Sequence, residues 1–98
     1  MPAISISEER KTSLRKPNNY KVVFNNDDKT PMDFVVELLV HLFHHDSKTA
    51  MAITEEVHLK GKGLAGVYNY EIADQKVIES TSIARSNGYP LSVTLEVA

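Results

Sequence analysis

The sequence contains no cysteine, and that absence removes several classes of protein at once. Disulfide frameworks, zinc ribbons, iron–sulfur centres and thiol nucleophiles all depend on cysteine sulfur. Long apolar runs are also missing, since no stretch approaches the ~18 consecutive apolar residues of a membrane span. The first nine residues lack the basic-then-apolar layout of a secretory signal. We therefore expect a soluble, cytoplasmic protein with no membrane partner.

Motifs for common catalytic and metal sites are missing as well. The chain has no Gly-rich phosphate loop, no G-x-S-x-G elbow and no His-Glu-x-x-His pattern. His41, His44 and His45 cluster on the polar side of a predicted helix, where side chains usually meet water. The adjacent carboxylates Asp27 and Asp28 are not followed by the spacing of an EF-hand. We expect no enzyme, no metal site, no cofactor and no catalytic residue.

Clustered positive charge is restricted to the start of the chain. Residues 1–21 carry five Lys/Arg against two Glu, whereas residues 22–98 carry six against eleven Asp/Glu. An acidic body is a poor partner for nucleic acid, because binding requires cations that neutralise phosphates. We therefore expect no nucleic-acid partner.

Alternation of apolar and polar residues predicts three strands after residue 19. They cover residues 20–25, 64–70 and 91–97. In the last strand every second residue from Leu91 to Val97 is expected to face the core. Helical spacing predicts three helices, over about 31–43, 47–59 and 73–86.

The order of these elements, βααβαβ, predicts a single α+β domain over residues 20–98. Three antiparallel strands would form a small sheet, and three helices would pack against it as a two-layer sandwich. Thr30 is expected to cap the first helix, with Pro31 in its first turn, where a missing N–H costs nothing. Residues 1–19 are polar and aperiodic, which predicts a flexible N-terminal extension.

One set of polar residues suggests a binding site. The turn from Asn26 to Asp28 offers an amide and two carboxylates just before the first helix. If the first two helices pack together, His58 lies near that turn, beside a small apolar cleft. A carboxylate, an amide and a neutral imidazole can accept hydrogen bonds from an ammonium group. From the residues alone, the alternative is a capped helix and a hydrogen-bonded histidine.

The same turn lies in a longer motif. Residues 26–35 match the pattern Asn-Asp-Asp-x-Thr-Pro-Met-[Glu/Asp]-Phe-Val, and further matches include Val57-His58, Gly66-Val67-Tyr68 and Pro90-Leu91. In this motif and in a nearly gapless alignment from Tyr20 to Ala98, the sequence resembles the ClpS family. Members of that family recognise N-degrons for the ClpA–ClpP protease.

The resemblance implies an adaptor for substrates whose N-terminal residue is Phe, Leu, Tyr or Trp. It implies that Asn26, Asp27 and His58 bind the α-ammonium and the first peptide group. It also implies that the substrate is handed to the ClpA hexamer, with the extension 1–19 engaged by the ATPase. The oligomeric state is left open by the sequence, and a monomer is the default expectation. The resemblance implies that two residues of this chain contact the N-terminal domain of ClpA, namely Glu71 and Lys76. The residues implied to line or gate the side-chain pocket are Thr30, Met32, Val35, Thr54, Val57 and Leu91.

Thr54 departs from the family pattern, which commonly places a bulky Met at this position. A smaller residue there predicts a pocket that is wider near its floor. The alternative function is a protein-interaction module of the same fold, similar to the C-terminal domain of the ribosomal stalk protein. Such a module has no need of Asn26 and Asp27 beside His58, and this feature discriminates the two hypotheses.

Overall fold

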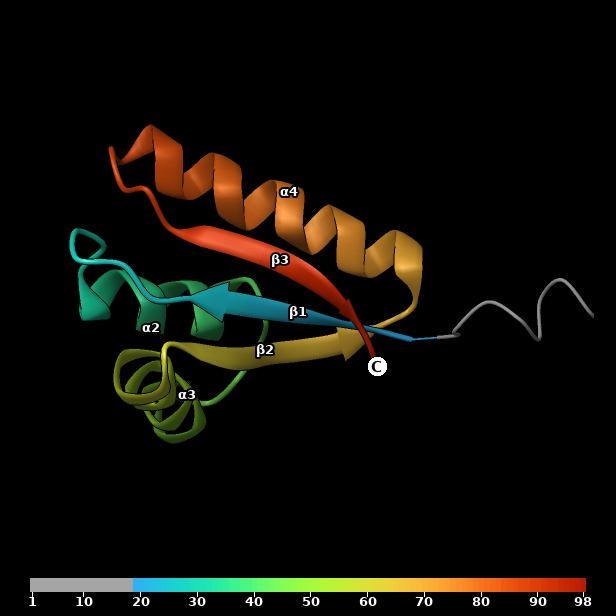
Figure 1. The fold of residues 1–98 in the computed structure, drawn as a ribbon, viewed down its shortest axis with the longest axis horizontal. Helices are drawn as coiled ribbons and strands as arrows, with labels where there is room; N and C mark the ends of the chain where they lie inside the picture. The colour runs from blue at the N-terminus through green and yellow to red at the C-terminus, as the bar shows by residue number, and fades with distance from the viewer. Residues whose placement is uncertain (1–18) are drawn as a thin grey trace, which may run out of the picture.

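The computed structural model describes residues 19–98 (Figure 1). The elements are β1 (Tyr20–Asn25), α2 (Met32–His41), α3 (Ser47–Lys60), β2 (Lys62–Tyr68), α4 (Tyr70–Ser86) and β3 (Ser92–Val97). The strands form one antiparallel sheet in the order β2-β1-β3. The predicted α+β fold with βααβαβ order is therefore confirmed. Of the predicted extension 1–19, all but Asn19 lies outside the described residues.

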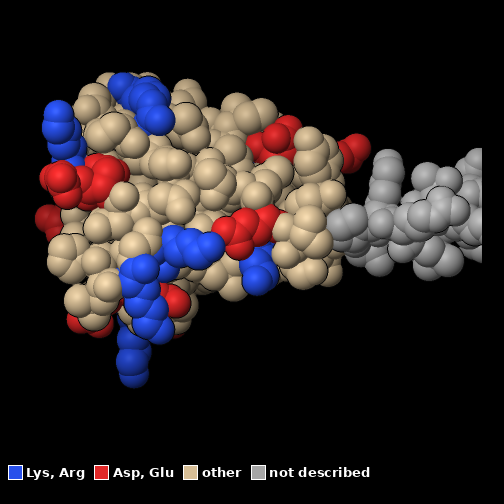
Figure 2. All heavy atoms as spheres, viewed as in Figure 1, with Lys and Arg blue, Asp and Glu red and all other residues tan. Residues whose placement is uncertain are grey.

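Strand β1 occupies the centre of the sheet, and both of its faces are covered. Val22 and Phe24 are fully buried under the helices. On the other face, Lys62 of β2 and Glu96 of β3 form an ion pair across β1, with a distance of 3.0 Å between Nζ and Oε2. Val23 lines the same shallow hollow as this pair and is nearly buried. Figure 2 shows acidic and basic side chains next to one another on this view of the molecule.

The helices and the sheet share one apolar core. Phe24 and Phe43 meet edge to face, with ring centroids 5.4 Å apart, which joins β1 to the end of α2. Helix α4 runs along β3, while α3 packs beside β2 (Figure 1). The residues of the core include Val22, Phe24, Val35, Leu38, Leu39, Phe43, Ala50, Val57, Ala65, Ala73, Ala84, Leu91 and Val93.

The start of α2 differs from the prediction. Its N-cap is Pro31, which makes no side-chain cap hydrogen bond, and the helix begins at Met32. Thr30 does not cap the helix, because α2 begins one residue later than predicted, with Pro31 at the N-cap position. The hydroxyl of Thr30 instead donates to the Oδ2 of Asp27 at 2.8 Å, within the turn before the helix.

The boundary between β2 and α4 also differs from the prediction. Tyr70 was expected in the strand but is the first residue of the helix. The cause is Asn69, whose side-chain oxygen accepts a hydrogen bond from the N–H of Ile72 at 3.0 Å and so caps the helix. Val97, expected to face the core, is 60 % exposed at the end of β3. No helix in residues 19–98 combines the length and the apolar character needed to cross a bilayer.

Candidate functional site

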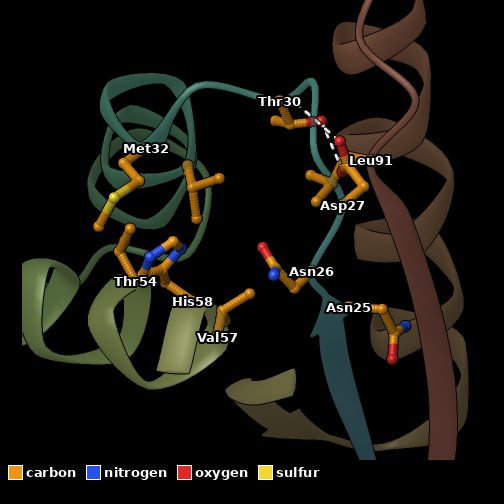
Figure 3. Close-up of a pocket in the computed structure, with 10 residues that line it drawn as sticks. Asn25, Asn26, Asp27, Thr30, Met32, Thr54, Val57, His58 and Leu91 are labelled. Atoms are coloured by element: carbon orange, nitrogen blue, oxygen red, sulfur yellow. Dashed lines mark hydrogen bonds between the residues drawn. The ribbon is translucent and has the colours of Figure 1, made fainter. Parts of the chain in front are cut away.

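A small cavity lies where the end of β1 and the following turn meet helices α2 and α3 (Figure 3). Its volume is about 20 Å³, enough for about one water molecule. Polar atoms from the turn and from α3 stand around an apolar interior. The cavity is lined by Asn25, Asn26, Asp27, Thr30, Met32, Val35, Thr54, Val57, His58 and Leu91.

The structure brings together all nine residues that sequence analysis assigned to substrate binding. It adds Asn25, which sequence analysis missed. The side-chain amide of Asn25 donates to the carbonyl oxygen of Ser92 and to the hydroxyl of Thr94, both at 3.2 Å, and so holds β3 against β1. The two residues assigned to the ClpA interface, Glu71 and Lys76, lie on α4 and do not line this cavity.

The carboxylate of Asp27 is fixed by its own turn. Its Oδ1 accepts hydrogen bonds from the backbone N–H groups of Lys29 and Thr30, both at 2.7 Å, and its Oδ2 accepts one from the hydroxyl of Thr30. Partial burial raises the pKa of Asp27, but these hydrogen bonds and the charge of Arg85 outweigh it, so the pKa lies below its usual value. The group is therefore an anion at neutral pH.

This carboxylate still has capacity for a ligand. An ionised carboxylate offers about four lone-pair sites, and the turn occupies three of them. The remaining site belongs to Oδ2. The turn therefore supplies a negative charge in a fixed orientation together with one open acceptor site.

The interior of the cavity is apolar, although Thr54 belongs to it. Val35, Val57 and Leu91 are buried members of the core. Thr54 is 3 % exposed, and its hydroxyl donates to the carbonyl oxygen of Ala50 at 2.8 Å. Because the hydroxyl is satisfied within the helix, the rest of the side chain contributes apolar surface. The exception among the walls is Met32, which is 45 % exposed.

The end of α3 places His58 at the rim. His58 follows Thr54 by four residues, so both side chains lie on the same side of the helix. The helix ends at Gly61, which adopts the left-handed conformation with φ of 92°. A Cβ on Gly63 would approach the Cγ2 of Val57 to 2.8 Å. A glycine at this position therefore allows β2 to pack closely against the helix that carries Val57 and His58.

Two of the histidines singled out in the sequence, His41 and His45, contact other protein groups. No group of three potential ligands lies close enough together within residues 19–98. The Nε2 of His41 lies 2.9 Å from the Oε1 of Glu37, whereas the ring of His45 contacts the carbonyl oxygen of Ala65 at 2.6 Å.

These features define a small α+β binding domain with one apolar slot and an anionic, hydrogen-bonding rim. Residues 15–94 match the family model described as "ATP-dependent Clp protease adaptor protein ClpS". Clp protease adapter proteins ClpS of Shewanella pealeana and Shewanella piezotolerans are each 44 % identical over 93 residues, which are 95 % of this chain and 91 % of each relative. The chain therefore belongs to the ClpS family of Clp protease adaptors.

A solved structure supports this assignment at the level of the fold. Agrobacterium tumefaciens ClpS2 bound to L-phenylalaninamide superposes with a TM-score of 0.80 at 32 % sequence identity. The match covers 85 % of this chain and all of the other. The alternative of a stalk-like interaction module does not account for the polar-rimmed cavity or for this family membership.

Proposed function

We propose that the cavity holds the N-terminal residue of an N-degron substrate, which this ClpS adaptor delivers to the Clp protease. The α-ammonium would lie at the rim, with Asp27 supplying the negative charge and Asn26 and His58 further acceptors. The large apolar side chain of Phe, Leu, Tyr or Trp would enter between the apolar walls. The single observation that carries this proposal is the anionic Asp27, with one open acceptor site, at the mouth of an apolar cavity.

The ligand of the Agrobacterium relative supports the proposal by its chemistry. L-Phenylalaninamide has an α-amino group, a phenyl side chain and an amide. These are the groups that an N-terminal phenylalanine presents when a peptide bond follows it. A cavity with an ammonium-binding rim and an apolar interior suits the same three groups in this chain.

Affinity near micromolar suits such an adaptor. Burying one Leu or Phe side chain contributes about 1.5–3 kcal/mol, and each hydrogen bond to the charged ammonium contributes about 1.5–3 kcal/mol. The costs of association reduce this sum toward the ~8 kcal/mol of a micromolar complex. Substrates bound this weakly can be released to the protease.

We further propose that the protease component is ClpA with ClpP, and that the contact is made from α4. Glu71 is exposed in the first turn of α4 and is free to meet the ClpA N-terminal domain. Lys76 is less available, because its ammonium donates to the carbonyl oxygen of Leu42 at 2.7 Å and lies over the rings of Phe43 and Tyr68. Its part in the interface would be to hold α4 against the end of α2.

The adaptor role requires no catalysis by this chain, and we propose none. We also propose the cytoplasm as its compartment and a monomer as its working form, because an adaptor must share a compartment with its protease and one chain carries the whole cavity.

A titration series tests the proposed binding. Fluorescently labelled peptides that differ only in the first residue would be measured by polarisation. Peptides beginning with Phe, Leu, Tyr or Trp should bind near micromolar, whereas those beginning with Ser or Glu should not. With the Phe peptide, Asp27→Ala should lose most of the affinity and His58→Ala a substantial share. His41→Ala, an exposed histidine outside the cavity, is the matched control. Equal binding of all first residues would refute the proposal.

A further inference from the structure

One wall of the pocket, Leu91, comes from the segment between α4 and β3. Leu91 is buried and lines the cavity, and Figure 3 shows it across the pocket from Met32 and Thr54. The pairing of β1 with β3 reaches only as far as Asn25 and Ser92. Leu91 therefore lies one residue outside the regular pairing of the sheet, so other contacts have to fix its position.

The guanidinium of Arg85, in the last turn of α4, holds this segment. Its Nη1 donates to the carbonyl oxygens of Tyr89 and Leu91, both at 2.9 Å. Pro90 lies between these two residues and has no N–H with which to make a hydrogen bond of its own. Hydrogen bonds from a charged donor are shorter and stronger than neutral ones. One side chain thus fixes the main chain on both sides of Pro90.

Helix α2 holds the same segment through an aromatic contact. The ring of Tyr89 meets the ring of Phe34 edge to face, with centroids 4.9 Å apart. Phe34 directly precedes Val35, which is another wall of the pocket. The segment that carries Leu91 is therefore attached to α4 through Arg85 and to α2 through Phe34.

We propose that Arg85 is a positioning residue for substrate binding, because it holds the main chain from Tyr89 to Leu91 and so keeps Leu91 in place as a fixed wall. This inference rests on the proposed function, in which the cavity receives the first residue of a substrate. It adds a residue that does not itself line the cavity. With Leu91 held, the half-exposed Met32 is the wall left to yield when a side chain enters.

The charge of Arg85 acts on the same site in the opposite direction. Partial burial raises the pKa of Asp27, the hydrogen bonds of its turn lower it, and the charge of Arg85 adds to the lowering. A cation that acts on Asp27 also repels the ammonium of a substrate held there. Loss of this charge alone would strengthen binding, whereas loss of the fixed wall would weaken it. The direction of the change therefore distinguishes the two effects.

Substitution of Arg85 tests the proposal by polarisation with a Phe-initiated peptide. Arg85→Met removes both hydrogen bonds and the charge, and it should lower affinity by about threefold to tenfold, since part of an apolar contact is lost. Both hydrogen bonds come from one nitrogen, so the ammonium of Arg85→Lys can replace them and should restore part of the affinity. An affinity of Arg85→Met equal to or above that of wild type would overturn the inference, as would a Lys variant no better than the Met variant.

Two control variants separate position from net charge and from stability. Lys21→Met removes a cation that lines the hollow on the open face of the sheet. Asn69→Ala removes the cap at the other end of α4 and should lower stability without touching the Leu91 segment. Both variants should bind the Phe peptide as wild type does. A loss of affinity in either control as large as that in Arg85→Met would overturn the inference.

Methyl NMR of the free protein measures the position of the wall without any peptide. The methyl signals of Leu91 should shift in Arg85→Met, whereas those of Leu39 should stay in place. These two leucines are matched in burial, at 1 % and 0 % exposed, and Leu39 does not line the cavity. Leu91 signals that are unchanged in Arg85→Met would contradict the positioning role.

Free and N-acetylated forms of the Phe peptide separate this inference from the proposed function. When wild type binds only the free peptide and Arg85→Met binds it equally well, the positioning role fails and the proposed function stands. When wild type binds both forms alike, the proposed function fails, and a role of Arg85 in substrate binding fails with it.

Discussion

The backbone N–H of Asn26 donates to the carbonyl oxygen of Gly61 at 2.9 Å, which joins the end of β1 to the end of α3. The end of β1 and the end of α3 carry the polar rim of the cavity. Asp27 lies next to the end of β1, and His58 lies close to the end of α3. Residues separated by about thirty positions in the sequence are thus held at one site by a hydrogen bond between main chains.

Gly61 and Gly88 provide a test of this connection. Both have positive φ, 92° and 79°, and neither has another atom within 4 Å of an added Cβ. Alanine at either position should therefore cost about 1 kcal/mol of stability through backbone strain alone. We expect Gly61→Ala to weaken binding of a Phe-initiated peptide as well, because Gly61 holds Asn26. Gly88→Ala should show the stability loss only. Urea denaturation and polarisation of both variants check this, and equal peptide affinities would contradict the role of Gly61.

The hydrogen bonds to Asp27 make stability depend on pH in a defined direction. The pKa of Asp27 in the folded chain lies below its ordinary value of 3.8, so the charged form is favoured by folding. This contribution is fully present above the ordinary value and is lost as pH falls through the lower, folded pKa. Asp27→Asn should therefore be less stable than wild type at pH 7, with a difference that shrinks below about pH 4.

Denaturation by urea at pH 7, 4 and 3 measures that difference. Asp28→Asn is the matched control, because Asp28 is the neighbouring exposed carboxylate and does not line the cavity. A gap between Asp27→Asn and wild type that stays constant over this range would show that the charge of Asp27 is not stabilised by its turn.

Met32 is the wall expected to move when a substrate enters. A cavity of about 20 Å³ cannot admit the side chain of Leu or Phe as it stands. Val35, Val57 and Leu91 are packed in the core, whereas Met32 is half exposed and flexible. We expect Met32→Ala to leave stability nearly unchanged and to raise affinity for Val- and Ile-initiated peptides by about threefold to tenfold. Met51→Ala, which replaces an exposed methionine that does not line the cavity, is the control. Equal affinities of Met32→Ala and wild type for Val- and Ile-initiated peptides would show that the gate lies elsewhere.

Replacing Glu71 and Lys76 one at a time should have two different effects, one on binding to ClpA and one on stability. Lys76→Met removes a charged hydrogen bond to the end of α2 and should cost about 1–3 kcal/mol of stability. Glu71→Lys should cost less, about 0.3–1 kcal/mol, because it places a cation at the N-terminal end of a helix, and it should weaken binding to the isolated ClpA N-terminal domain. Calorimetry and urea denaturation measure the two effects, and neither variant should alter peptide affinity. A Glu71→Lys protein that binds the ClpA domain normally would remove this residue from the interface.

Local patterns in the sequence predict the helices and strands well, but they predict poorly which groups form hydrogen bonds and which strands pair. The apolar stripe of α2 was sufficient to predict that helix, because amphipathic spacing reflects burial directly. The hydrogen bond of Thr30 was not predictable from the sequence. Its hydroxyl could accept from a backbone N–H of the helix or donate to Asp27, and only the geometry of the turn decides. Asn69 was ambiguous in the same way, as asparagine favours both turns and helix caps. Strand order depends on contacts between distant residues, which periodicity does not contain.

The candidate site shows a similar division. The motif resemblance implied nine residues that the structure arranges around one cavity, whereas helical periodicity places side chains on faces without giving the distances between helices. The satisfied hydroxyl of Thr54 and the internal hydrogen bond of Lys76 left no signal in the sequence. Both depend on which carbonyl group lies within reach after folding.

The central claim is that Asp27 and its neighbours hold a charged α-amino group while an apolar side chain fills the adjoining slot. Two otherwise identical peptides beginning with Phe, one free and one N-acetylated, test it most directly by fluorescence polarisation. Acetylation removes the charge and leaves the rim without a hydrogen-bonding partner, so affinity should fall by about a hundredfold or more. Equal affinities for the two peptides would contradict the claim.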